Sequence, residues 1–170
     1  DLKDGSSINQ TKQVVQCIVK NIQNDENIIN ISAFMGVGQP LDFAALVKQS
    51  ALKNKESQAE LMINIRKQED RDITSYNLVT KLRDDVQKNC SLYDANIKFI
   101  ELPAGPPVLA SIVTEIYGGK TFESRRDFAL KIAQILKNQA TLVDIDILAD
   151  DDFLMYELEV NSSKVIMSKI

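Results

Sequence analysis

The chain has 170 residues, of which 44% are hydrophobic and 26% are charged, so it can bury a core and wholesale disorder is excluded. The sequence contains no His and no Trp, which excludes Ser-His-Asp and Cys-His catalysis and His-ligated zinc or haem. Its 20 Lys and Arg residues against 24 Asp and Glu residues give a net charge of -4. Because no overall positive field exists to hold a phosphate backbone, we expect no nucleic-acid partner.

The ends of the chain and its cysteines bear on its origin. The sequence begins Asp-Leu-Lys-Asp without an initiator Met or a signal-peptide pattern, so we expect a processed chain or a segment of a longer one. Its longest mainly apolar stretches, around 28–37 and 108–117, fall far short of the roughly 20 residues of a membrane span. The sequence leaves open whether Cys17 and Cys90 are free thiols or form one disulfide in an oxidising compartment.

The first elements along the chain are a helix and two strands. Ser6 or Ser7 can cap a helix over about 7–23, in which apolar residues recur at i, i+3, i+4 and i+7. A β-branched, apolar run predicts a strand at 28–34. Alternation of apolar and polar residues predicts a second strand that begins at Ala59.

A second helix and a further strand follow. Asp72 or Thr74 can cap a helix that ends near Asn89, and β-branched and aromatic residues at 97–100 predict another strand. Residues 1–102 thus predict an α+β fold, a ferredoxin-like βαββαβ unit whose first strand is truncated before the chain begins.

Between the first two strands lies a long connection at 36–58. It carries two Gly, a Pro and many polar residues without clear periodicity, and it exceeds the usual length of connections in compact domains. Loops of this length usually bind something or move. The loop is therefore the candidate functional segment of the first half.

A Pro-rich stretch divides the chain, because the three prolines within 103–108 remove backbone donors and cannot continue a central strand. The second half, 109–170, predicts a partial βαββα unit that repeats the order of the first. Its expected elements are a strand at 109–117, a helix ending near Asn138, strands at 142–148 and 154–160, and a helix from Ser162 or Ser163 to Ile170.

No motif in the sequence carries catalysis or a metal. Asp144 and Asp146 share a strand face and could bind Ca²⁺ or Mg²⁺, but a solvated strand face is favoured because the EF-hand spacing is absent. The Gly36-Val37-Gly38 stretch lacks the third Gly and the Lys-Ser/Thr pair of a phosphate-binding loop. We expect no catalytic residue, no metal site and no cofactor.

The junction between the two halves carries a family resemblance. Residues 100–118 read IELPAGPPVLASIVTEIYG, which resembles the junction of two periplasmic porter subdomains in permeases of the resistance-nodulation-division (RND) efflux superfamily. The pattern there is acidic-Leu-Pro-x-Gly-Pro-Pro-Val, followed by a strand that ends in Glu-Val/Ile-Tyr-Gly. Residues 1–7, DLKDGSS, resemble the turn that opens the first subdomain, and 142–146 and 156–160 are similar to paired strands of the second.

The resemblance implies the periplasmic part of a proton-driven inner-membrane transporter from a Gram-negative bacterium, of the kind linked to multidrug resistance. Residues 1–102 would form one porter subdomain and 109–170 the front part of a second, joined by the Pro-rich junction at 103–108. The implied partners are small amphiphilic substrates, the other subunits of a homotrimer, a periplasmic adaptor and an outer-membrane channel. The proton-relay residues of the family lie in membrane helices that this chain does not contain.

The resemblance also assigns a role to the long loop, which aligns with a loop that separates two substrate pockets in drug-exporting relatives. The candidate residues of the substrate path are Met35, Gly36, Val37, Gly38, Pro40 and Phe43. The junction has no Met of the kind that heavy-metal relatives use, which disfavours copper export. The alternative interpretation is a freestanding ferredoxin-like module that binds a small ligand between its two halves.

Overall fold

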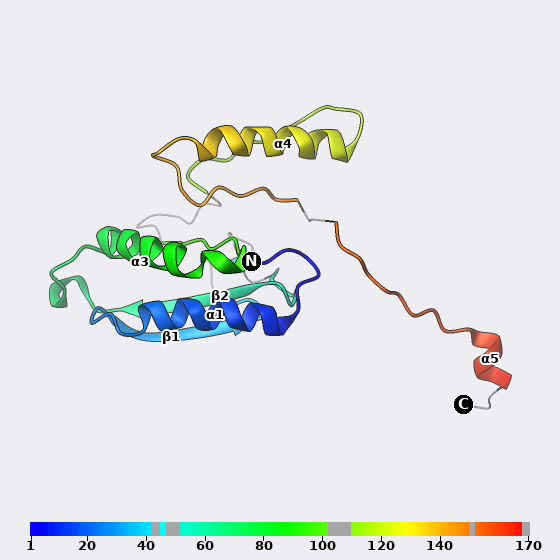
Figure 1. Cartoon of the computed structure of the whole chain (residues 1–170), viewed down its shortest axis with the longest axis horizontal. Coiled ribbons are helices and arrows are strands. Elements are labelled where there is room, and N and C mark those ends of the chain that lie inside the picture. Colours follow the sequence, from blue (N-terminus) through cyan, green and yellow to red (C-terminus); the bar gives the residue numbers. More distant parts are fainter. Residues whose placement is uncertain (42–44, 47–51, 102–109, 150–151, 168–170) are drawn as a thin grey trace.

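The computed structural model describes residues 1–41, 45–46, 52–101, 110–149 and 152–167. Within them the chain forms a mixed α+β structure with a small antiparallel sheet of two strands (Figure 1). The helices and strands are α1 (Ile8–Ile22), β1 (Ile28–Met35), β2 (Ala59–Ile65), α3 (Ser75–Cys90), α4 (Phe122–Lys137) and α5 (Ser162–Met167), with 3₁₀ turns η2 (Gln68–Asp70) and η3 (Ser91–Tyr93). The Pro-rich junction and Phe43 lie outside the described residues.

Local capping fixes the start of each long helix of the first half. In α1, the Ser7 side chain accepts from the Gln10 N–H, and Gln10 Oε1 accepts from the Ser7 N–H at 2.8 Å, which completes a capping box. In α3, Thr74 Oγ1 accepts from the Asn77 N–H at 3.2 Å. Both expected helices are confirmed, and Thr74 rather than Asp72 is the cap of the second.

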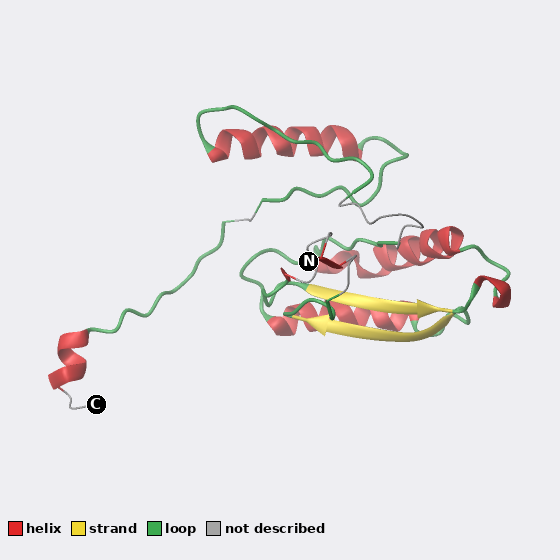
Figure 2. Ribbon diagram, turned by 180° about the vertical axis from the view of Figure 1, so that it is seen from behind, coloured by secondary structure: helices red, strands yellow, loops and turns green. Residues whose placement is uncertain are grey.

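The two strands also form where the sequence predicts them. They pair antiparallel, with Ile31 opposite Ile63 and Ala33 opposite Leu61. Figure 2 shows the strands from behind, with α1 on their far side. The sheet face toward the helices is apolar, and Ile31, Leu61 and Ile63 pack against the core. Strand alternation has therefore placed one row of side chains inside.

The core lies where α1 and α3 pack together over this face. Its side chains recur at helical spacing on both helices, so one stripe of each helix is buried. The core residues are Val14, Ile18, Ile22, Leu78, Leu82, Val86 and Cys90.

A disulfide links the same two helices. Cys17 of α1 is bonded to Cys90 at the end of α3, with the two Cα atoms 6.0 Å apart. The sequence left this pairing open, and the structure decides it. The bond joins residues 73 positions apart, so it constrains the unfolded chain strongly.

The strand expected at 97–100 does not form. Ala95, Ile97 and Phe99 pack against the core as an extended segment, but no neighbouring strand in the described residues completes a ladder with them. A single hydrogen-bonded pair joins this segment to the N-terminus: Asp1 donates to the Asn96 carbonyl at 2.9 Å, and the Asn96 N–H donates to the Asp1 carbonyl at 2.8 Å.

The second half forms its helices without its strands. Both expected helices are present, with α4 capped by Thr121 and α5 beginning at Ser162, whereas 110–117, 142–148 and 154–160 are not strands. Alternation predicts which face of a strand is buried but does not supply the partner that a ladder needs. In addition, Asp144 has a φ of 56°, outside the β region. Among the described residues, no helix has both the length and the apolar character of a membrane span.

Candidate functional site

The loop between β1 and β2 has a fixed base. Met35 and Ala59 are the last register pair of the sheet, and the Gly36 N–H donates to the Gln58 carbonyl at 2.8 Å. Two residues further along the loop, the Gly38 N–H donates to the Lys53 carbonyl at 3.1 Å. The two arms of the loop therefore stay side by side well beyond the end of the sheet.

Gly36 sets the direction in which the chain leaves β1. Its φ is +70°, a conformation that costs residues with a Cβ free energy. A Cβ at this position would also lie 3.3 Å from Ile8 Cδ1 at the start of α1. The positive φ thus favours glycine here, and a larger residue would in addition push the end of the Ile8 side chain aside.

The second arm is tied to the N-terminus of α1. Glu56 Oε2 accepts from the Ile8 N–H at 3.0 Å, and Thr11 Oγ1 donates to the Glu56 carbonyl at 2.6 Å. A carboxylate at this position also interacts favourably with the helix dipole. On the first arm, Glu60 Oε2 accepts from the Gln39 N–H at 3.0 Å. The base of the loop is held by β2 and α1 together.

At and beyond this base the loop exposes large apolar side chains. Val37, Leu41, Leu46 and Leu52 are 54%, 71%, 54% and 69% exposed. Sequence reasoning named Val37 but missed the three leucines. The sequence did contain a signal for their exposure, because they are large apolar residues in a segment without the periodicity of core residues. Such exposed residues on one loop can contact an amphiphilic molecule.

The sequence-predicted path residues fall into two groups. Met35, Gly36 and Gly38 are half-buried at the base, whereas Val37 and Pro40 are exposed. Gly36 accordingly sets the path of the loop, and Val37 and Pro40 are its exposed members. Phe43, the remaining candidate, lies outside the described residues.

An ionic cluster closes the base on the side of the N-terminus. Lys53 Nζ lies 2.9 Å from Asp1 Oδ1, and Lys98 Nζ lies 4.0 Å from Asp1 Oδ2. Burial lowers the pKa of Lys53, and burial also lowers the pKa of the Asp1 α-amine to about 6, helped by the nearby Lys53 and Lys98 charges. Both amines are partly buried, so the surroundings disfavour their protonated, positively charged forms.

The acidic pair of the second half contacts basic side chains of the first half. Asp144 Oδ2 accepts from Arg83 Nη2 at 2.8 Å and from the Phe99 N–H at 3.2 Å. Asp146 accepts from Asn96 Nδ2 at 3.0 Å and pairs with Lys98. Among the described residues, no three His, Cys, Asp or Glu side chains form a group that could hold a metal ion. The pair thus attaches the second half to the first.

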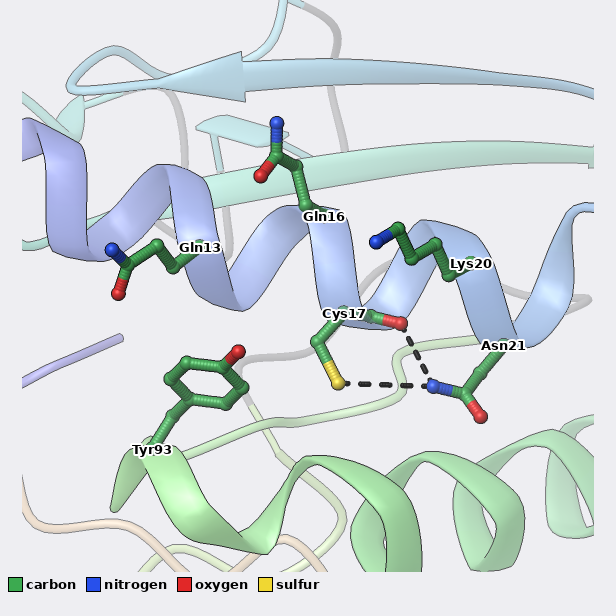
Figure 3. Close-up of a pocket in the computed structure, with 6 residues that line it drawn as sticks. All are labelled: Gln13, Gln16, Cys17, Lys20, Asn21 and Tyr93. Atoms are coloured by element: carbon green, nitrogen blue, oxygen red, sulfur yellow. Dashed lines mark hydrogen bonds between the residues drawn. The ribbon is translucent and has the colours of Figure 1, made fainter.

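Two surface hollows lie away from the loop. One, of about 190 Å³, is formed by polar side chains of α1 together with Tyr93 (Figure 3). Between two of its lining residues, Asn21 Nδ2 donates to the Cys17 carbonyl at 2.8 Å. The other, of about 490 Å³, is lined by Ile28, Ile29, Arg66, Lys67 and Asp70. Neither contains a predicted path residue.

No protein-family model, no curated protein and no solved structure matches this chain.

Proposed function

We propose that this chain is the periplasmic porter portion of a proton-driven RND-type exporter and that the loop at 36–58 lines its substrate path. One observation carries the proposal: the loop exposes Val37, Leu41, Leu46 and Leu52 above a base that is hydrogen-bonded to β2 and α1. Exposed apolar surface binds the apolar part of an amphiphile, with about 25 cal/mol gained per Å² that is buried. A fixed base keeps that surface in place.

The bonds of the N-terminus support a ferredoxin-like arrangement of residues 1–102. Asp1 and Asn96 exchange both backbone bonds, which is the pattern of an antiparallel hydrogen-bonded pair. On the other side, the Leu2 N–H donates to the Ser57 carbonyl at 2.9 Å, just before β2. A strand that ends at Leu2 would then lie between β2 and 95–99. This is the order that a βαββαβ unit requires.

The disulfide supports a compartment outside the cytosol. Structural disulfides persist in oxidising environments such as the bacterial periplasm and are rare in reducing ones. The Cys17–Cys90 bond joins the two helices that form the core, so reduction would loosen the first half as a whole. A periplasmic location, as part of an inner-membrane protein of a Gram-negative bacterium, would keep this disulfide oxidised and the first half stable.

In this function the chain itself performs no covalent chemistry. The loop contacts substrate, the Gly36 turn allows the loop to leave β1 at a fixed angle, and 109–170 forms part of the neighbouring subdomain. Proton coupling belongs to membrane helices elsewhere in the transporter. A homotrimer, a periplasmic adaptor and an outer-membrane channel complete the proposed assembly.

The test is made on the full-length protein that contains this chain. Its reading frame should encode apolar spans on both sides, and cells that express it should extrude an amphiphilic dye until an uncoupler collapses the proton gradient. A reading frame without such spans would contradict the proposal. Saturable binding of a small ligand to that protein in calorimetry would then support the freestanding module instead.

A further inference from the structure

The two ends of the Cys17–Cys90 disulfide differ in their exposure. Cys90 is 1% exposed and belongs to the core, whereas Cys17 is half-buried. Cys17 also lines the surface hollow of about 190 Å³ on α1, and Cys90 does not (Figure 3). A reagent that arrives from solvent therefore reaches Cys17 first in the folded chain.

The rim of this hollow suits a negatively charged sulfur. Lys20 and Asn21 lie three and four residues after Cys17, so the helical repeat places them on its face of α1. Figure 3 shows the Lys20 ammonium turned back along α1 in the direction of Cys17. None of the described residues that line the hollow is acidic. An incoming thiolate is therefore attracted to this opening.

Asn21 holds an amide donor beside both sulfur atoms. Its Nδ2 lies 3.7 Å from Cys17 Sγ and 3.6 Å from Cys90 Sγ. The same Nδ2 donates to the Cys17 carbonyl at 2.8 Å, and Asn21 Oδ1 accepts from Asn89 Nδ2 at 2.6 Å, so both ends of the amide are held. Hydrogen bonds to an ionised acceptor are about twice as strong as those to a neutral one, so this donor stabilises a sulfur that becomes a thiolate.

We propose that Cys17 is a thiol-exchange site, at which the thiolate of an incoming cysteine attacks Cys17 Sγ while Asn21 stabilises the departing Cys90 thiolate. A new S–S bond forms to Cys17 Sγ as the Cys17–Cys90 bond breaks. The electron pair of the broken bond stays on Cys90 Sγ, which then takes a proton from water.

A second incoming thiolate completes the reduction. It attacks the reagent's sulfur in the mixed disulfide, so that Cys17 leaves as a thiolate and is protonated by water. The two incoming thiols end as a disulfide, and the bond between α1 and α3 is reduced. The same steps in reverse install the bond, with Cys17 carrying the mixed disulfide and Cys90 resolving it. This inference concerns the first half alone and does not depend on transport.

Reduction of the oxidised 170-residue chain by glutathione tests the route. If the thiol enters the hollow of the folded chain, the rate should be proportional to the glutathione concentration. It should also change by less than about twofold in urea concentrations well below the unfolding midpoint. A rate that rises steeply with low urea would overturn the proposal, because the bond would then be reached only by unfolding. Thioredoxin in place of glutathione shows whether the hollow also admits a thiol borne on a protein.

The role of Asn21 has its own variant. Asn21→Leu removes the donor at similar side-chain size and should slow reduction by about tenfold, the effect of losing a hydrogen bond to a charged group. Asn77→Leu, at an exposed position on α3, is the matched control and should react like the wild type. Loosened packing around the disulfide would speed reduction instead, so an unchanged or faster rate in Asn21→Leu would overturn the assigned role.

Charge and site are tested in the same assay. Lys20→Glu should slow reduction by glutathione several-fold at low ionic strength and less in 1 M salt, whereas Lys12→Glu, outside the hollow, should not. In Cys90→Ala, Cys17 should form a mixed disulfide with oxidised glutathione at least tenfold faster than Cys90 does in Cys17→Ala, as followed by mass spectrometry. Equal rates at the two cysteines would overturn the assignment of Cys17.

Discussion

Arg83 and Asp144 join the two halves of the chain, with Arg83 Nη2 2.8 Å from Asp144 Oδ2. Both side chains are mostly buried, at 13% and 16% exposed, and the guanidinium carbon lies 5.6 Å from the centre of the Phe99 ring. Arg83 Nε and Asp144 Oδ1 are buried without a hydrogen-bond partner among the described residues. A pair with such unsatisfied atoms contributes little net stability but fixes one arrangement of the segments that it joins.

Removing the Asp144 carboxylate should expose the Phe99 N–H, which donates to it. In Asp144→Ala we expect the Phe99 amide to exchange about fivefold faster, the effect of losing a hydrogen bond worth about 1 kcal/mol. Hydrogen exchange followed by NMR measures this rate. Asp146→Ala is the matched control, because Asp146 contacts Asn96 and Lys98 but not this amide. Equal acceleration in both variants would show that the Asp144 contact does not protect Phe99.

The disulfide should account for a large share of the stability of the first half. Replacing both Cys17 and Cys90 by Ser should lower the free energy of unfolding by about 4 kcal/mol, the chain-entropy value for a closed loop of this length. Urea titration of the oxidised wild type and of the double variant measures the difference. The wild type in excess dithiothreitol should unfold like the double variant. An unchanged midpoint after reduction would contradict the assigned bond.

The core assignment is tested by a pair of leucines. Leu78 is fully buried in α3, whereas Leu92 in η3 is 93% exposed. Leu78→Ala should lower the free energy of unfolding by about 3 kcal/mol, through lost burial and the cavity that remains. Leu92→Ala should change it by less than about 0.5 kcal/mol. Similar losses in both variants, measured by urea unfolding, would place the core elsewhere.

Stability of the chain that begins at Asp1 should rise with pH between about 6 and 8. Burial lowers the pKa of the Asp1 α-amine from its ordinary 8.0 to about 6, so in this window the unfolded chain binds more protons than the folded one. Protonation at lower pH therefore favours unfolding, by about 2 kcal/mol over the whole window. The sequence has no His to obscure the effect.

Acetylation of the α-amine provides the control for this pH dependence. It keeps an N–H that can donate to the Asn96 carbonyl and removes the titrating charge. Urea unfolding of the acetylated chain should give the same stability at pH 6 and pH 8. A slope as steep as that of the free amine would assign the pH dependence to other groups.

Locally encoded features were predictable from the sequence. Ser7 and Thr74 cap their helices through side chains a few residues away, and the alternation after Ala59 needs only its own strand to be recognised. Features that join distant segments were not predictable. Neither the Cys17–Cys90 bond nor the Arg83–Asp144 pair leaves a local pattern, because each depends on how whole elements pack.

The strands of the second half depend in the same way on how distant segments pair. Alternation at 154–160 predicts a strand, and this prediction is wrong among the described residues, because a strand also needs a partner, which no local pattern contains. In the loop, the sequence drew attention to the glycines and missed Leu41 because periodicity marks core residues and not exposed ones.

Whether the loop lines a substrate path is tested most directly by dye export from cells that express the full-length protein with Val37→Ser and Leu41→Ser together. Both side chains are more than half exposed, so the variant should keep the abundance and the thermal stability of the wild type. If the loop lines the substrate path, the rate of amphiphilic dye export should fall several-fold, whereas Leu92→Ser, an equally apolar-to-polar change at an exposed site outside the loop, should leave it unchanged. Export at the wild-type rate by the double variant would contradict the assignment of this loop to the substrate path.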